Sequence, residues 1–199
     1  MLKTALITGA SRGLGKAIAD VFSTNGYGLI LHCKERPPRL GNWVCGDLRS
    51  KDTITNLTKA AQERDIDVLV NNAGIYLDQP FWETSEKEFK KMLDINLLAP
   101  ILLTKAIWPI FQKKKSGIVM NINSIAGKVA SNGESAYCAS KYGLRGFSDS
   151  IKFDAIRDNI HVLDVYPHAM KTDMMRYRKN YESLPESTKI AQAVFECCR

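Results

Sequence analysis

Residues 5–15 read Ala5-Leu6-Ile7-Thr8-Gly9-Ala10-Ser11-Arg12-Gly13-Leu14-Gly15, a short apolar run followed by a turn that holds three glycines. Beyond this turn, apolar residues recur at Leu14, Ile18, Val21 and Phe22, which is the spacing of a helix lying on a sheet. Glycine lets a backbone turn tightly and approach a ligand closely, and the free N–H groups of a helix N-terminus favour phosphate. The stretch therefore predicts a strand, a turn that binds the pyrophosphate of a dinucleotide, and a helix.

The same alternation of strand and helix patterns continues along the chain. Apolar runs follow at 29–31, 43–45, 68–70, 118–120 and 162–165, and helical patterns lie near 50–63, 86–114, 135–157 and 187–197. Buried strands separated by helices indicate a parallel sheet with helices on both faces. We expect one α/β domain over residues 1–199, a three-layer doubly wound parallel sheet (Rossmann fold) of six strands without a closing strand. Pro37 and Pro38 predict a loop, not a helix, between the second and third strands.

Composition narrows the class of protein. The chain has 199 residues, of which 45% are hydrophobic, enough for one well-formed core. The net charge is +7, but the cations are scattered apart from small clusters at 113–115 and 171–179, which favours a solvated surface over a nucleic acid partner. The apolar stretch 97–111 is interrupted by Thr104, Lys105 and two prolines, so we interpret it as a buried helix and expect no membrane span.

The cysteines show neither the spacing of metal ligands nor a disulfide framework; they stand at positions 33, 45, 138, 197 and 198. This pattern indicates reduced thiols in the cytoplasm and no metal site. The adjacent Cys197 and Cys198 are either a redox pair or two ordinary helix residues.

Tyr137 and Lys141 lie one helical turn apart, and Tyr137 stands thirteen residues after Ser124. A phenol normally keeps its proton until about pH 10, and a cation beside it favours the phenolate. A Lys at i+4 is thus expected to make Tyr137 a usable proton donor. Such a pair alone is also common on exposed helix faces, but its place downstream of the glycine turn favours catalysis.

The second strand bears on the choice of cofactor. It ends at His32-Cys33-Lys34, with no acid before Glu35, while Arg12 lies in the glycine turn. A carboxylate here would accept a hydrogen bond from the ribose 2′-OH of NAD, whereas cations accommodate the 2′-phosphate of NADP. The pair Arg12 and Lys34 therefore favours NADP(H) over NAD(H). Two solvated cations, or a Glu35 that turns inward, are the alternatives.

On these residues the chain resembles the short-chain dehydrogenase/reductase family over nearly its whole length. The matching cofactor segments are the glycine turn (Gly9, Ser11, Arg12, Gly13, Leu14, Gly15), Asp47 with Leu48 after the third strand, Asn71-Asn72-Ala73-Gly74 after the fourth, and Pro167, Met170 and Thr172 after the sixth. Asn96, Ser124, Tyr137 and Lys141 match the catalytic tetrad in order and spacing. His168 departs from the Gly that usually follows the Pro.

The resemblance implies an oxidoreductase that interconverts a carbonyl and an alcohol. Tyr137 would be the general acid/base, Ser124 would bind the substrate oxygen, and Lys141 would lower the Tyr137 pKa and hold the nicotinamide ribose. Asn96 would fix a helix irregularity and a water that relays protons. The plain alternatives are a strand-end cap for Ser124, a buried amide for Asn96 and a packed aromatic for Tyr137.

The resemblance also assigns roles around the cofactor. Asp47 would contact the adenine ring, and Asn71, Ala73 and Gly74 would border the adenine-ribose side of the cleft. Thr172 would hydrogen-bond the nicotinamide amide or the pyrophosphate, unless it merely caps a helix.

Substrate choice is expected from three segments: the loop after Gly74 (Ile75, Tyr76, Phe81, Trp82), residues 126–132, and residues 168–185, where Met174, Met175, Tyr177 and Tyr181 alternate with Arg176, Arg178 and Lys179. We expect a small or medium ketone or aldehyde. The resemblance also implies the family's usual homodimer, formed by the helices at 135–157 and 86–114. Alternative functions are a non-catalytic NADP-binding sensor, and an epimerase or dehydratase that retains its cofactor.

Overall fold

A computed structural model describes residues 2–35, 41–177 and 180–198. The described residues form a six-stranded sheet in the order β3-β2-β1-β4-β5-β6, and every neighbouring pair runs parallel. The strands are β1 Thr4–Ile7, β2 Gly28–Cys33, β3 Trp43–Cys45, β4 Val68–Asn71, β5 Gly117–Ile122 and β6 Ile160–Val165. The expected doubly wound α/β fold with six strands is confirmed.

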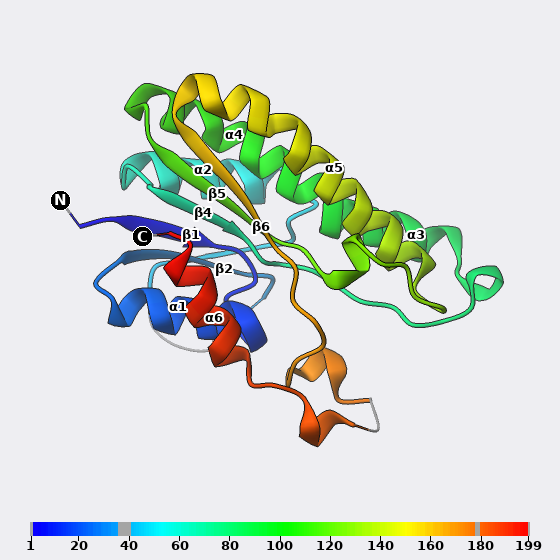
Figure 1. Ribbon diagram of the computed structural model, residues 1–199. Coiled ribbons are helices and arrows are strands. Elements are labelled where there is room, and N and C mark those ends of the chain that lie inside the picture. Colours follow the sequence, from blue (N-terminus) through cyan, green and yellow to red (C-terminus); the bar gives the residue numbers. More distant parts are fainter. Residues whose placement is uncertain (1, 36–40, 178–179, 199) are drawn as a thin grey trace.

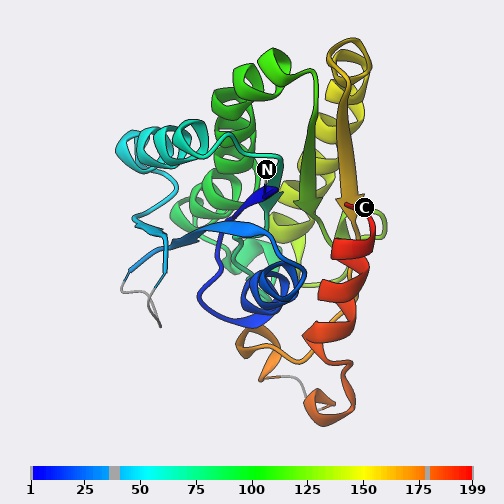
Figure 2. The ribbon, with the colours of Figure 1, turned by 90° about the vertical axis from the view of Figure 1, so that its left-hand side faces the viewer.

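Helices cover both faces of the sheet, as Figures 1 and 2 show. One face carries α1 and α6, and the other carries α2 and α5 together with the long helix of α3 and α4; the bounds are α1 Gly13–Thr24, α2 Lys51–Glu63, α3 Glu86–Leu93, α4 Ala99–Lys114, α5 Ser135–Asp158 and α6 Ser187–Glu196. A hydrophobic core lies on each face of the sheet, and alternate residues of β1 pack into the two cores. Ala5 and Ile7 pack toward α1, and Leu6 packs toward α2 and α4. A strand buried on both faces needs such a continuous apolar run.

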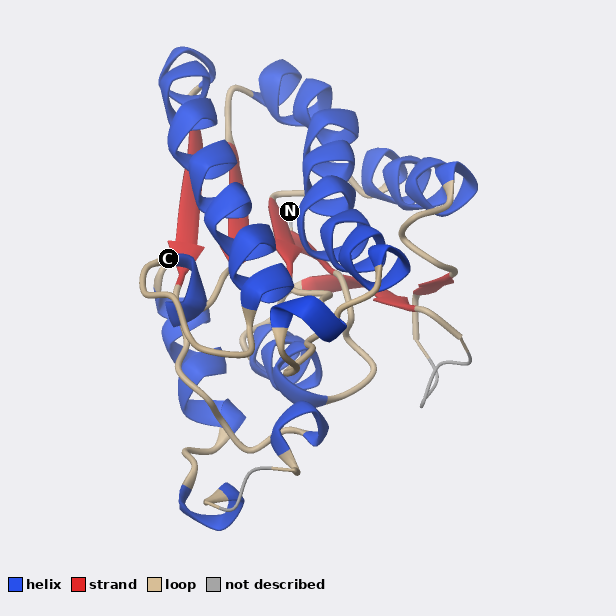
Figure 3. Ribbon diagram, turned by 90° about the vertical axis from the view of Figure 1, so that its right-hand side faces the viewer, coloured by secondary structure: helices blue, strands red, loops and turns tan. Residues whose placement is uncertain are grey.

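The helical pattern at 86–114 forms one long helix with an irregular centre. A π-helical segment, Asp94–Leu98, joins α3 to α4. By length and composition this helix, Glu86–Lys114, could cross a membrane. In the fold, however, Leu103, Ile107 and Phe111 are buried in the core under the sheet, and Figure 3 shows the long helices side by side on that face. We therefore interpret it as a core helix.

Short turns complete the fold. The structure adds 3-10 turns at Phe81–Glu83, Ile125–Gly127, Asp173–Met175 and Tyr181–Ser183, which the sequence patterns did not predict. The loop predicted between β2 and β3 falls partly on residues 36–40, outside the described residues.

The strand order places the site. β1 lies between β2 and β4, and the chain leaves β1 toward one face of the sheet and β4 toward the other, so the crevice opens at the carboxyl ends of these two strands. The N-terminus of α1 and the segment after β6 border the same crevice (Figure 1).

Candidate active site

A cleft of about 1030 Å³ opens at the carboxyl ends of the strands. Its walls include all the residues predicted to lie around the cofactor except Asn71, and three of the four predicted catalytic residues: Gly9, Ser11, Arg12, Gly13, Leu14, Gly15, Lys34, Asp47, Leu48, Asn72, Ala73, Gly74, Ser124, Tyr137, Lys141, Pro167, Met170 and Thr172. Residues far apart in the sequence thus meet in one hollow. Asn96 does not line it.

The glycine turn has the shape of a phosphate cradle. Gly9 and Gly13 have φ values of +65° and +53°, which side chains rarely adopt, and a Cβ on Gly9 would stand 2.9 Å from the Cα of Ala73. A Cβ on Gly15 would meet the carbonyl oxygen of Gly9 at 2.2 Å. The N-cap residue of α1, Arg12, offers no side-chain cap, so the first turn can donate its N–H groups to an anion. The turn fits a pyrophosphate.

Asn72 braces this turn from the end of β4. Its amide nitrogen donates to the carbonyls of Thr8 (2.8 Å) and Gly9 (3.3 Å), and the backbone N–H groups of Asn72 and Ala73 donate to the Thr8 hydroxyl. Asn71 was expected to border the cleft, and that prediction is wrong. Because adjacent strand residues face opposite sides, its side chain is buried and donates to Thr104 and Asn121.

The strand β2 contributes to the far end of the cleft. Lys34 lines the cleft, whereas Glu35 is absent from its walls. His32, which sequence reasoning did not assign, accepts the Gly9 N–H at Nδ1 (3.2 Å), so Nε2 carries the proton that it donates to the Gly46 carbonyl (2.9 Å). Burial lowers the His32 pKa, which keeps the ring neutral. A lone histidine in an apolar strand gave no functional signal.

Two further charges stand at this end. Arg12 is largely exposed, with its guanidinium 4.0 Å from Asp173. Asp47 accepts hydrogen bonds from the Arg49 guanidinium (2.6 and 2.9 Å), which hold the Asp47 pKa at about 2. The carboxylate is therefore charged at neutral pH.

Tyr137, Lys141 and Ser124 converge at the other end of the cleft. The Ser124 side chain lies close enough to the Tyr137 hydroxyl to lower the pKa of that phenol. The Lys141 ammonium lies 5.8 Å from the centre of the Tyr137 ring and donates to the Ile122 carbonyl at 2.9 Å. Ser124 also accepts the Ala126 N–H at 3.2 Å, so it is both a cap and a partner of the phenol.

The pKa values differ from the expectation that Lys141 lowers that of Tyr137. Burial raises the Tyr137 pKa, the Ser124 side chain opposes this, and the charge of Glu134 raises it further. Burial lowers the Lys141 pKa to about 8, against an upward pull from Asp164. Lys141 donates to the Ile122 carbonyl, and the pKa of Tyr137 is raised in this structure, not lowered as expected.

Glu134 is a cleft residue that sequence reasoning missed. It is only 8% exposed, and its carboxylate accepts a hydrogen bond from the Tyr76 hydroxyl at 2.7 Å. The Tyr76 ring packs edge-on against Tyr137 (5.0 Å between centres) and stacks on Tyr177 (6.0 Å). The one available signal was its position, three residues before Tyr137, at the N-cap of α5.

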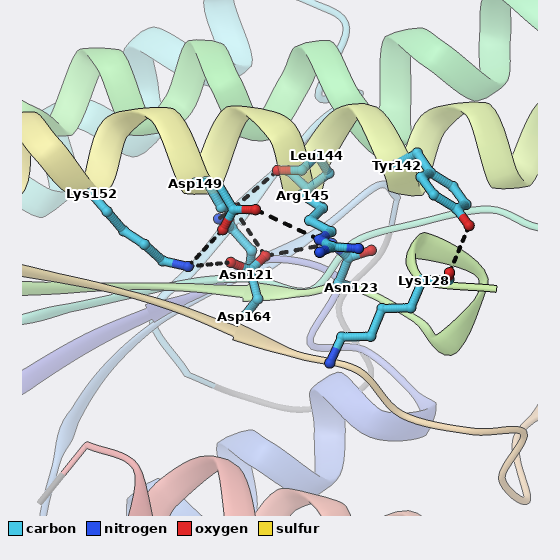
Figure 4. Close-up of polar contacts among 10 residues, drawn as sticks. Asn121, Asn123, Lys128, Tyr142, Leu144, Arg145, Asp149, Lys152 and Asp164 are labelled. Atoms are coloured by element: carbon cyan, nitrogen blue, oxygen red, sulfur yellow. Dashed lines mark hydrogen bonds and ion pairs between the residues drawn. The ribbon is translucent and has the colours of Figure 1, made fainter.

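A polar network around Asp164 adjoins the catalytic residues, and Figure 4 shows Asp164 with its partner Asn123. Asp164 on β6 accepts hydrogen bonds from Ser148 (2.9 Å) and Asn123 (3.5 Å), and the Asn123 side chain in turn accepts the Ser124 N–H (3.0 Å). Burial raises the Asp164 pKa, and its charge raises that of Lys141. Asp164 thus acts on both Ser124 and Lys141 without entering the cleft.

Asn96 lies in the π-helical segment and holds the loop that follows Gly74. Its side chain donates to the Ile75 carbonyl (2.9 Å) and accepts the Ile75 N–H (2.8 Å). It also donates to Ser140 on α5 (3.2 Å). Asn96 thus lies in a helix irregularity, as predicted. It is also a buried amide that bonds to backbone groups, which was the plain alternative.

The segment after β6 approaches the glycine turn. The Thr172 side chain makes no capping hydrogen bond and lies 3.4 Å from the point where a Gly13 Cβ would stand. His168 lines the cleft. Its φ is not positive, because the described non-glycine residues with positive φ are Asp65, Lys115 and Asn159. Glycine is therefore not required at 168.

The segments expected to choose the substrate contribute unevenly. Cleft walls come from Ile75, Tyr76, Ala126, Ser131, His168, Met174, Met175 and Tyr177. Phe81 and Trp82 are 65% and 81% exposed and do not line the cleft. Arg176 pairs with Asp173 at 3.0 Å and also lies off the walls, as does Tyr181. Arg178 and Lys179 lie outside the described residues.

Comparison with known proteins agrees with this geometry. A family model described as short chain dehydrogenase matches residues 3–183. The 3-oxoacyl-(acyl-carrier-protein) reductase FabG of Rickettsia prowazekii is 36% identical over 182 residues, 86% of this chain and 74% of the relative. The oxidoreductase UcpA of Salmonella typhimurium is 34% identical over 210 aligned positions, 96% of this chain and 80% of the relative.

Solved structures show the same fold. A short-chain dehydrogenase from Streptomyces avermitilis matches with a TM-score of 0.87 at 27% identity, covering 98% of this chain and 83% of that one. A protein from Beutenbergia cavernae matches with a TM-score of 0.88 at 23% identity, covering 97% and 88%. The chain belongs to the short chain dehydrogenase family, the NAD(P)-dependent oxidoreductases that interconvert alcohols and carbonyls.

Proposed function

We propose that the protein is an NADPH-dependent reductase of a ketone or aldehyde, or the corresponding alcohol dehydrogenase. The observation that carries the proposal is that Tyr137, Ser124 and Lys141 line one end of a cleft whose far end bears Lys34. The glycine turn between these two ends fits the pyrophosphate, so a dinucleotide would span the cleft.

The chemistry follows from the residues in place. A bound nicotinamide supplies or accepts the hydride. Tyr137 gives its proton to the carbonyl oxygen during reduction and takes it back during oxidation, and the Ser124 hydroxyl donates to the same oxygen as negative charge develops on it. Lys141 directs one N–H at Ile122 and has further donors for the ribose hydroxyls. We also propose that Asp47 contacts the adenine, Thr172 the nicotinamide or the pyrophosphate, and that a water near Asn96 relays protons.

Substitution of Tyr137 by Phe tests the activity. We expect NADPH oxidation with a carbonyl substrate to fall by about 10²- to 10⁴-fold, the usual contribution of a general acid, with unchanged NADPH binding by fluorescence. Tyr142→Phe is the matched control, because this tyrosine lies on the same helix but is exposed and donates to the Lys128 carbonyl. Wild type and Tyr137→Phe that bind NADPH but are equally inert would favour a sensor. Conversion without NADPH loss would favour an epimerase or dehydratase.

The cofactor preference rests on Arg12 and Lys34, which both line the cleft, and Lys34 offers the test. Replacing Lys34 by Ala should weaken NADP⁺ binding by about tenfold, the worth of one charge-assisted hydrogen bond to phosphate, and leave NAD⁺ binding nearly unchanged. Calorimetric titration with both nucleotides measures the difference. Equal losses for both nucleotides would contradict the preference for NADP.

The substrate is proposed from the walls above Tyr137. Tyr76, Met174, Met175 and Tyr177 offer an apolar, adaptable surface, and Glu134 adds one buried carboxylate. Small and medium ketones and aldehydes fit these walls. Because several relatives are 3-oxoacyl-(acyl-carrier-protein) reductases, a short 3-oxoacyl thioester is the first compound to test.

We further propose a cytoplasmic homodimer. Exposed apolar side chains lie on the long helix that contains α4, at Leu98 (46%) and Leu102 (43%), and on α5, at Phe153 (80%) and Ile156 (79%). Exposed apolar side chains on two adjacent helices indicate an interface. The cytoplasmic location rests on the reading of reduced cysteines.

A further inference from the structure

Two cysteines face each other beside the cleft and have no part in the proposed chemistry. Cys33 ends β2 and Cys45 ends β3, where they are directly paired in the sheet register. Their sulfur atoms are 2.9 Å apart. Cys33 is only 2% exposed, whereas Cys45 is open to solvent.

We propose that Cys33 and Cys45 form a reversible disulfide that weakens cofactor binding. Paired residues on adjacent strands have Cα atoms about 4.8 Å apart, within the range of about 4.4–6.8 Å that disulfides span. The bond therefore needs little movement of either strand. The other cysteines offer no comparable pair across the sheet among the described residues.

The exposure of the two thiols sets the order of reaction with a small disulfide such as oxidised glutathione. The Cys45 thiolate attacks one glutathione sulfur, forming a mixed disulfide and releasing one glutathione thiolate. Cys33 then loses its proton and attacks the Cys45 sulfur, which expels the second glutathione. Two protein thiols are oxidised and one small disulfide is reduced to two thiols. Burial and Cys45 raise the Cys33 pKa to about 12, consistent with Cys33 being the second thiol to react.

The bond would act on the cofactor through Lys34, and this step rests on the proposed function. The Cys33 S–H donates to the Glu35 carbonyl at 3.0 Å and so fixes the backbone on both sides of Lys34. A disulfide has no S–H, so the Glu35 carbonyl loses this donor and Lys34 is held less firmly. Loss of one neutral hydrogen bond is worth about a fivefold change in affinity. The fall is expected for NADP⁺ more than for NAD⁺.

Oxidised glutathione provides the test. Free thiols of the unfolded protein should fall from the five of the sequence to three, and peptide mapping should join the peptides of Cys33 and Cys45. NADP⁺ affinity should fall about fivefold and return with dithiothreitol. The Cys45→Ser variant should keep its NADP⁺ affinity and its remaining thiols after the same treatment. In the Cys33→Ser variant the reaction should stop at a mixed disulfide between Cys45 and glutathione. Cys197→Ser, which removes another exposed thiol, should behave as the wild type.

The outcomes separate the two proposals. Oxidation confined to Cys197 and Cys198, or five thiols remaining, overturns the disulfide. A linked pair with unchanged NADP⁺ affinity overturns its effect on binding. If reduced protein binds neither nucleotide, the proposed function fails, while the thiol count and the peptide map still report on the disulfide.

Discussion

Lys141 is a buried ammonium, and burial has a cost that can be measured. Its side chain lies in the core of the site, 5% exposed, and donates to the Ile122 carbonyl. Its pKa falls from 10.5 to about 8. The unfolded chain therefore holds the Lys141 proton more tightly than the folded protein does. A difference of this size corresponds to a penalty on the order of 3 kcal/mol at neutral pH.

Lys141→Met should therefore stabilise the protein while abolishing activity. Leaving the Ile122 carbonyl unpaired costs about 1–2 kcal/mol, so we expect a net gain of about 1–2 kcal/mol in the free energy of unfolding at pH 7. Between about pH 8 and 10.5 the unfolded chain binds more protons, so wild-type stability rises with pH relative to the variant. Urea unfolding at pH 7 and pH 9.5 measures both. A less stable variant at pH 7 would contradict this account; exposed Lys87→Met is the control.

Glu134 should set the pH range of catalysis. Its negative charge raises the Tyr137 pKa, so Glu134→Gln should lower it. Reduction needs the protonated phenol, and the decline of kcat/KM at high pH should begin at a lower pH in the variant. Oxidation needs the phenolate, so the increase of kcat/KM for oxidation with pH should also begin at a lower pH in the variant. Glu83→Gln, on the turn before α3, is the control. An unchanged profile would remove Glu134 from this role.

Single residues were predictable where the chain carries a spaced motif. The glycine turn, Ser124, Tyr137 and Lys141 all reach the cleft because strand ends and helix starts meet at one edge of a parallel sheet. Glu134 and Asp164 belong to no spaced motif. In a sequence, a single acidic residue buried in a site cannot be told from one exposed on the surface. The error about the Tyr137 pKa has another cause. Sequence spacing shows which side chains are near, but not how deeply each is buried.

At the scale of elements, α1 depends on a close approach that only glycine allows. Gly15→Ala would place a Cβ 2.2 Å from the Gly9 carbonyl oxygen and 2.4 Å from the Asn72 amide nitrogen. Because the first obstacle is backbone, the turn or the helix must shift. We expect a loss of roughly 2–4 kcal/mol in the free energy of unfolding, as for an overpacked core, and loss of NADPH binding. Denaturant unfolding and nucleotide titration measure the two effects.

Gly28→Ala on β2 is the matched control for that substitution. Its Cβ would meet the Thr4 hydroxyl at 3.3 Å, the tip of a side chain that can turn away. We expect a change within about 1 kcal/mol. Equal destabilisation by both substitutions would mean that the glycine turn carries no special constraint.

Strands and helices were predictable in number and order, but the π-helical segment was not. Apolar runs mark buried parallel strands, and apolar residues at helical spacing mark α1 and α2 with bounds close to those observed. The segment Asp94–Leu98 changes the hydrogen-bond register of the backbone while its apolar spacing still reads as one helix. The resemblance to the family, and not periodicity, pointed to Asn96.

For the whole molecule, the proposed dimer gives a direct test. Phe153 is 80% exposed on α5, and a charge there would be buried without a partner in an interface. Phe153→Glu should convert a dimer at micromolar concentration to a monomer, measured by sedimentation velocity. Leu2→Glu, at a residue 68% exposed beside β1, is the control and should leave the mass unchanged. A monomeric wild type would contradict the dimer.

The packing of α6 on α1 bears on how the protein is made. Phe195 packs edge-on against Phe22 and Tyr27, closing the core on that side of the sheet, and Thr172 reaches back to Gly13. On the ribosome the first helix emerges long before these partners do, so the nascent chain carries an uncovered aromatic patch throughout most of translation. Chaperones that shield such patches should associate with the growing polypeptide and leave once Phe195 has emerged from the ribosome and packed on α1.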